Sequence, residues 1–169
     1  MITERNTRNM GRAFVYIVIA TVLLLFMGIV TTNIAGAKKV YSCTGTYLVD
    51  IGEGETRTEG IWTISQDGTF QGTDSAEQVF GFSQQQGAWV SNGSYQAKAT
   101  WLDFSFDPNL PTPGGYVRVD AEFIFGSDCE SMTGTLDVWF YLDTEDPLDR
   151  TTGGTSSSDI SFTGRRVNP

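Results

Sequence analysis

The residues that could perform chemistry in this sequence are few, and most of them are carboxylates. None of the 169 residues is a histidine, which excludes Ser-His-Asp and Cys-His catalysis and any site with histidine metal ligands. A carboxyl group can act as an acid or base where an apolar pocket raises its pKa. Strand alternation places Asp120, Glu122 and Asp137 outward. Asp103 lies where the pattern of its strand changes; a solvated position is favoured for it, and a buried catalytic acid is the alternative.

A second group of carboxylates lies in one loop, at Asp143, Glu145, Asp146 and Asp149. Calcium binds clusters of oxygen ligands, but this spacing matches no calcium loop, and the turn glycine of an EF-hand is missing. A solvated acidic loop is therefore the favoured interpretation. We expect neither a metal site nor a cofactor.

Residues 1–37 have the pattern of a targeting segment. Three arginines precede an apolar run over residues 13–30, and a site of small residues ends at Ala37. This pattern predicts a signal peptide cleaved after Ala37. The alternative is an uncleaved anchor over residues 13–32, because the run has nearly the length of a membrane span. Both place residues 38–169 outside the cytoplasm, as a secreted or periplasmic domain or as one anchored in the membrane.

The two cysteines, Cys43 and Cys129, favour a disulfide, because the compartment predicted for them is oxidising. In the chain-entropy model, a bridge across so long a loop stabilises the fold by about 4–5 kcal/mol. Two buried free thiols are one alternative, and a lipobox ending at Cys43 is a weaker one. With no histidine and no free thiolate nucleophile, the sequence does not favour an enzyme.

The predicted exported domain is strongly acidic. The arginines and the one glutamate of residues 1–37 leave 8 of the 11 Lys and Arg, and 19 of the 20 Asp and Glu, in residues 38–169, which gives a net charge of −11. Phosphates and anionic membrane surfaces repel such a domain. We expect no nucleic-acid partner, and contact with a membrane only through an uncleaved N-terminal segment. The oligomeric state is left open.

Residues 38–169 read as an all-β domain, because apolar and polar residues alternate with the period of a half-buried strand. Residues 117–125, VRVDAEFIF, are the clearest case. Strands are predicted near residues 44–51, 60–66, 69–82, 86–91, 94–106, 116–126, 132–142 and 159–167. Eight strands can close into a barrel without exposed edges, so the predicted fold is an eight-stranded antiparallel up-and-down β-barrel.

Two stretches of the domain repeat one pattern. Residues 60–73 read GIWTISQDGTFQGT and residues 87–100 read GAWVSNGSYQAKAT. Asp-Gly in the first and Asn-Gly in the second are strong two-residue turn signals. Each stretch is therefore predicted to be a β-hairpin, arising either from a short duplication or from convergence on the same turn chemistry.

The predicted connections sort to the two ends of the barrel. The tight turns lie at residues 67–68, 92–93 and 127–131, and the long loops at residues 52–59, 107–115 and 143–158. Cys43 and Cys129 both fall at the tight-turn end if residues 69–82 form one bulged strand, so one strand is preferred to two. The long-loop end would be a mouth, with its loops as lids or as plain connections on a solid barrel.

One stretch, residues 95–106 (YQAKATWLDFSF), breaks the alternation. An apolar face runs up to Trp101, and apolar residues then continue at Leu102, Phe104 and Phe106. A β-bulge near Trp101 would explain the change.

Several of these features together resemble a known group of proteins. Gly60-Ile61-Trp62 on an early strand, an eight-stranded meander, a secretory signal and basic residues at Arg165 and Arg166 are similar to the lipocalin-like calycin barrels. The layout also resembles the allene oxide cyclase and dirigent barrel group. The resemblance implies a small apolar ligand, and a structural contact of Trp62 with Arg165 or Arg166. The chain departs from the lipocalin pattern in the strand that precedes Gly-x-Trp.

The aromatic residues that could line the interior suggest the function. The candidate ligand-binding residues are Trp62, Phe82, Trp89, Trp101, Phe104, Phe123 and Phe140. We expect an exported binding module for a small hydrophobic or aromatic ligand that enters at the long-loop end. One alternative is a filled barrel that recognises a protein or a glycan through its loops. Another is a cyclase or isomerase, which would need an inward polar residue such as Asp103, Tyr95 or Tyr116.

Overall fold

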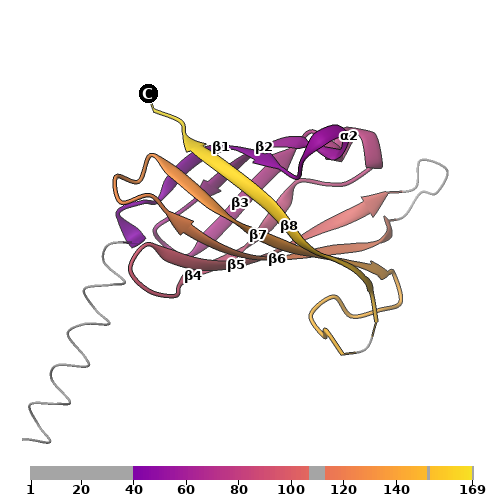
Figure 1. Cartoon of the computed structure of the whole chain (residues 1–169). Coiled ribbons are helices and arrows are strands. Elements are labelled where there is room, and N and C mark those ends of the chain that lie inside the picture. Colours follow the sequence, from indigo (N-terminus) through magenta and orange to yellow (C-terminus); the bar gives the residue numbers. More distant parts are fainter. Residues whose placement is uncertain (1–39, 107–112, 152, 169) are drawn as a thin grey trace, which may run out of the picture. The chain divides into compact units, whose positions relative to one another are not determined.

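The strands close into one antiparallel barrel, in which each strand pairs with its neighbours in sequence and the last returns to the first (Figure 1). The computed structural model describes residues 40–106, 113–151 and 153–168. The strands are β1 Gly45–Ile51, β2 Thr58–Ile64, β3 Thr69–Asp74, β4 Gln85–Ser91, β5 Gln96–Phe106, β6 Pro113–Phe125, β7 Ser131–Leu142 and β8 Thr155–Arg166. The predicted all-β fold, with eight antiparallel strands in up-and-down order, is confirmed.

Two features that the sequence predicts lie in parts of the chain that the structure does not describe. The signal or anchor segment, residues 1–37, and residues 107–112 of the loop predicted at 107–115 lie outside the described residues. No helix in the described part of the chain has the length and apolar character needed to cross a bilayer.

Alternation along the strands builds the core, as β6 shows. Val117, Val119, Ala121, Phe123 and Phe125 are all buried, and the residues between them are not. Both predicted hairpins are also present: β2 pairs with β3, and β4 pairs with β5. These elements form where the sequence predicts them because period-two alternation and Asx-Gly turns are local signals.

The prediction of one bulged strand over residues 69–82 is wrong in its second half. The strand β3 ends at Asp74, and a short helix, α2 (Ala76–Phe80), follows. Asp74 Oδ1 accepts a hydrogen bond from the Ala76 N–H, and Glu77 Oε1 accepts one from the Asp74 N–H. Such local side-chain bonds compete with a strand ladder, and Gly81, at φ +71°, ends the helix in the left-handed conformation.

The predicted bulge at Trp101 is also wrong. The β5–β6 pairing runs unbroken through Trp101, and the register shifts only between Ser105 and Phe106. Asp103 therefore continues the inward face, and Phe104 lies on the outer wall, 46% exposed and 5.7 Å from the Tyr116 ring. The outer wall carries aromatic residues here, which is why the apolar pattern seemed to change faces.

The two ends of the barrel differ in their connections, as predicted. The turns after β2, β4 and β6 are short and share one end, the closed end, with Cys43. The opposite, open end carries η1 (Gly54–Thr56), α2 and the connection from β7 to β8. Part of that last connection lies on the outer wall, since Arg118 Nη1 donates to the Pro147 carbonyl at 3.0 Å. Residues 147–150 are therefore not a lid over the mouth.

Candidate functional site

Aromatic side chains fill the middle of the barrel. The Trp62 ring lies 5.1 Å from the Trp101 ring and 4.8 Å from the Phe162 ring, and Phe70 stacks on Trp101 at 4.3 Å. All four side chains are buried. The expected contact between Trp62 and a basic residue of the last strand does not form, because Phe162 occupies that side of Trp62 and Arg166 lies over Tyr47 instead.

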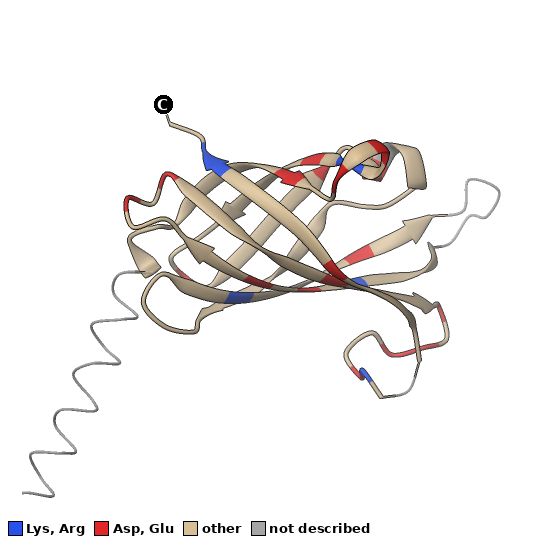
Figure 2. Cartoon of the chain, in the orientation of Figure 1, with Lys and Arg blue, Asp and Glu red and all other residues tan. Residues whose placement is uncertain are grey.

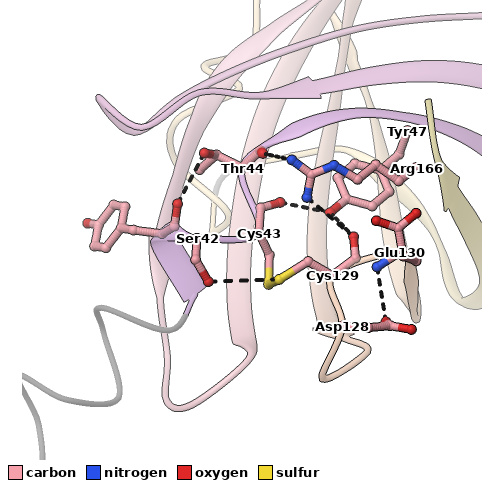
Figure 3. Close-up of a disulfide and its surroundings, with 9 residues drawn as sticks. Ser42, Cys43, Thr44, Tyr47, Asp128, Cys129, Glu130 and Arg166 are labelled. Carbon is pink, nitrogen blue, oxygen red and sulfur yellow. Dashed lines mark hydrogen bonds between the residues drawn. A yellow bond between two sulfur atoms is a disulfide. The ribbon is translucent and has the colours of Figure 1, made fainter. Parts of the chain in front are cut away.

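The closed end is held by a disulfide and a set of satisfied polar groups (Figure 3). Cys43 and Cys129 are bonded, with their Cα atoms 4.8 Å apart, so the predicted pair is confirmed and Cys43 is not a lipidation site. The buried Tyr47 hydroxyl donates toward the carbonyls of Cys43 and Cys129, at 2.7 and 2.9 Å. Arg166 Nη2 donates to the Thr44 carbonyl at 2.8 Å. A disulfide in this position fits an oxidising, extracytoplasmic compartment.

One layer higher, toward the open end, the interior becomes polar. Trp62 pairs with Gly72, and Gly72 pairs with Gln85. The Gln86–Leu102 pair places Gln85 and Asp103 side by side on the inner face of β4 and β5. The Gln85 side chain is 3% exposed and Asp103 is 6% exposed, so the two lie among the core residues.

Gly72 makes room for the Gln85 amide. A Cβ atom on Gly72 would lie 2.3 Å from Gln85 Oε1 and 2.9 Å from Trp62 Cδ1. Gln85 Nε2 donates to Asp74 Oδ2 at 2.7 Å. Glu77 Oε2 accepts from the Thr73 hydroxyl at 2.7 Å, which fixes this carboxylate at the start of α2. The side chains of Asp74 and Glu77 thus form the upper boundary of the polar layer.

Four buried polar atoms around this layer have no hydrogen-bond partner: Asp103 Oδ1, Gln85 Oε1, Trp62 Nε1 and Trp101 Nε1. Burial raises the pKa of Asp103 to about 7, and the negative charges of Asp74 and Glu77 add to this effect. A carboxyl with that pKa exchanges its proton near neutral pH. The layer can therefore donate and accept hydrogen bonds, and hold or release one proton.

Phenylalanine side chains surround the entrance above this layer. The Phe82 ring lies 6.3 Å from Phe140 and 6.2 Å from Phe80. Phe140 pairs with Val117, which pairs with Asp103, and it is 44% exposed. A hollow of about 590 Å³ borders Phe140, and Ser105, Tyr116, Tyr141 and part of the β7–β8 connection line it as well. Phe82, Gln85 and Asp103 are not among its lining residues.

The predicted ligand-binding residues separate into four groups. Trp62 and Trp101 form the floor of the polar layer, and Phe82 and Phe140 lie at the entrance. Trp89 and Phe123 are core residues nearer the closed end; Trp89 Nε1 donates to the Ser65 carbonyl in the β2–β3 turn. The Phe104 side chain lies on the outer wall of the barrel, apart from the other six predicted ligand-binding residues.

Sequence reasoning missed Gln85, Asp74 and Glu77. A signal for Gln85 was present, since counting back by twos from the buried Trp89 reaches Gly87 and then Gln85. Asp74 and Glu77 carried no such signal, because their positions depend on α2.

Comparison of the chain with protein-family models, with curated proteins and with solved structures finds no match. The closed eight-stranded antiparallel barrel is consistent with the lipocalin-like architecture that the sequence resembles. Within the described residues, no group of three or more His, Cys, Asp or Glu is placed to hold a metal ion.

Proposed function

We propose that the protein is an exported barrel that binds one small ligand with an apolar or aromatic body through its open end. The ligand would lie on Trp62 and Trp101, beneath the Phe82 and Phe140 rings, with its polar group at Gln85 and Asp103. Secretion, retention in a periplasm or anchoring by residues 13–32 would each present this opening to an extracytoplasmic solution.

The observation that carries the proposal is the pair of unpartnered acceptors, Asp103 Oδ1 and Gln85 Oε1. Buried polar groups in folded proteins nearly always have partners, and leaving one without a partner costs about 1–3 kcal/mol. Two such acceptors on adjacent strands, below an aromatic entrance, support a binding site whose partner arrives from solution.

Native mass spectrometry of the exported, oxidised chain tests the proposal. We expect extra mass that disappears on denaturation, or binding of an added apolar probe with a change in tryptophan fluorescence. In the variant Gly72→Ala, a methyl group would crowd Gln85 and Trp62, and binding should weaken. Gly164→Ala is the matched control, since its methyl group would crowd Met132 and Val49 rather than Gln85 and Trp62.

Two results would contradict the proposal. A clean apo mass with no response to apolar probes would indicate a filled barrel, and would direct attention to its loops as a surface for a protein or a glycan. Equal loss of binding in Gly72→Ala and Gly164→Ala would mean that the polar layer is not the site.

The position of Asp103 favours a second candidate, an enzyme of the cyclase or isomerase kind. A buried carboxyl whose pKa is about 7 can donate a proton to an apolar substrate near neutral pH. Recovery of the bound molecule distinguishes the two candidates. An unchanged molecule after prolonged incubation supports binding; conversion that Asp103→Asn abolishes, while binding persists, supports the enzyme.

A further inference from the structure

We propose that the ligand carries a protonated amine, and that Asp103 and Gln85 receive it as a charged acceptor and a neutral acceptor side by side. This inference rests on the proposed function, and it names the chemical class of the ligand. It follows from the unpartnered acceptors and the local charge balance.

The unpartnered atoms of Gln85 and Asp103 are acceptors, whereas those of Trp62 and Trp101 beneath them are indole N–H donors. Gln85 Nε2 donates to Asp74 Oδ2, and this bond orients Gln85 Oε1 away from Asp74. Asp103 Oδ1 is a carboxylate oxygen without a donor. An ammonium group has three N–H donors and no acceptor, so one ammonium can satisfy both atoms and retain a donor for a water molecule.

The charges around the layer favour a cation. Asp74 and Glu77 lie close enough to Asp103 to disfavour its ionisation. Within the described residues, no lysine or arginine forms an ion pair with any of these three carboxylates. Figure 2 shows acidic residues around α2 and in the connection after β7, at the same end of the barrel. This field would attract an ammonium ion and repel a carboxylate.

The floor of the site suits the same class of ligand. Trp62 and Trp101 lie edge to face, 5.1 Å apart and fully buried. Indole rings attract cations through their faces, and they also pack against an apolar body. An aromatic or alkyl amine therefore matches the acceptors, the charge and the floor together.

The test uses three probes that share a phenyl body and differ in the terminal group: 2-phenylethylamine, 2-phenylethanol and 3-phenylpropionate. Their affinities for the full, oxidised chain are measured by isothermal titration calorimetry at one ionic strength and near neutral pH. We expect the amine to bind about tenfold more tightly than the alcohol, since charge-assisted hydrogen bonds exceed neutral ones. The propionate should bind weakest.

Variants of the two acceptor residues test whether these residues cause the preference for the amine over the alcohol. Asp103→Asn keeps the shape of the side chain and should reduce the difference between amine and alcohol to about threefold or less, because it weakens binding of the amine more than binding of the alcohol. Gln85→Met removes the second acceptor and should weaken binding of the amine, which has several N–H donors, more than binding of the alcohol, which has one O–H donor. Asp137→Asn is the matched control, because Asp137 lies on the outer wall, and it should change nothing. Near-ultraviolet circular dichroism checks that each variant is folded.

Three other outcomes would contradict the amine inference, and the last of them would contradict the proposed function as well. If the alcohol binds and the amine binds no more tightly, the amine inference fails and the proposed function stands. If the amine preference persists in Asp103→Asn and Gln85→Met, the general negative charge of the domain causes it, and the inference fails. If none of the probes binds, and native mass spectrometry shows no bound molecule, both proposals fail.

Discussion

The closed and open ends of the barrel differ in whether their buried polar groups have hydrogen-bond partners. At the closed end, the Tyr47 hydroxyl and the Arg166 guanidinium reach backbone carbonyls beside the Cys43–Cys129 disulfide. At the open end, Asp103 and Gln85 are as deeply buried but keep acceptors without donors. This difference is what we expect if one end stabilises the fold and the other gives up stability for the proposed site, as functional sites commonly do.

The largest expected effect comes from removing the covalent link at the closed end. The disulfide joins residues separated by 86 positions, so Cys43→Ser with Cys129→Ser should lower the free energy of unfolding by about 4–5 kcal/mol. Urea denaturation measures this loss. Below the unfolding transition, probe binding at the open end should be unchanged; a parallel loss of binding would show that the two ends are not independent.

The next effect concerns Asp103 and depends on pH. Its pKa rises from 3.8 to about 7 in the folded state, so between these values the native chain holds a proton that the unfolded chain has released. Stability should therefore fall as pH rises through this window, by up to about 4 kcal/mol, and change little from this cause above it.

Asp103→Asn isolates that contribution, because other carboxyl groups titrate equally in both proteins. The difference in unfolding free energy between variant and wild type should grow in favour of the variant from about pH 4 to about pH 8. Urea denaturation across this range measures it. A constant difference would show that Asp103 is ionised without penalty, and would weaken the contrast between the ends.

Two tyrosines offer a smaller and direct comparison. Tyr47→Phe removes a hydroxyl that serves two carbonyls at the closed end, and should destabilise the fold by about 1–3 kcal/mol. Tyr141→Phe removes a buried hydroxyl with no partner, on the strand end near the mouth, and should change stability by less than about 0.5 kcal/mol. Equal losses in thermal or urea unfolding would argue against the contrast.

The smallest effect is expected between the two ends, on the outer wall. Lys98 and Glu122 form an exposed ion pair across β5 and β6, and such pairs contribute about 1 kcal/mol or less. Glu122→Gln should therefore move the urea midpoint only slightly, and the shift should vanish in high salt. A larger loss would show that the wall, and not only the closed end, stabilises the barrel.

The sequence predicted those parts of the molecule whose signals are local. Alternation in residues 117–125 and the Asp-Gly and Asn-Gly turns specify strands and hairpins without knowledge of the rest of the chain. The cysteine pair followed from the predicted export and from the sorting of turns to one end. The short helix α2 was missed because it depends on hydrogen bonds of Asp74 and Glu77 with nearby backbone.

The candidate site was only partly predictable. Trp62, Trp101, Phe82 and Phe140 were named for their size, and the structure places these four around one region. Asp103 was assigned to solvent because the outward Phe104 and Phe106 imitated an inner face. Only the pairing of β5 with both neighbours resolves which face is which, and that is a property of the closed sheet rather than of the strand.

The closure of the sheet has a consequence for how the molecule is assembled. One edge of β1 pairs with β2 and the other with β8, so the second edge stays uncovered until the last strand has formed. Until Thr155–Arg166 is available for pairing, both β1 and β7 present free edges, which are templates for pairing with other chains. A chain interrupted before β8 should therefore aggregate rather than accumulate as a smaller folded barrel.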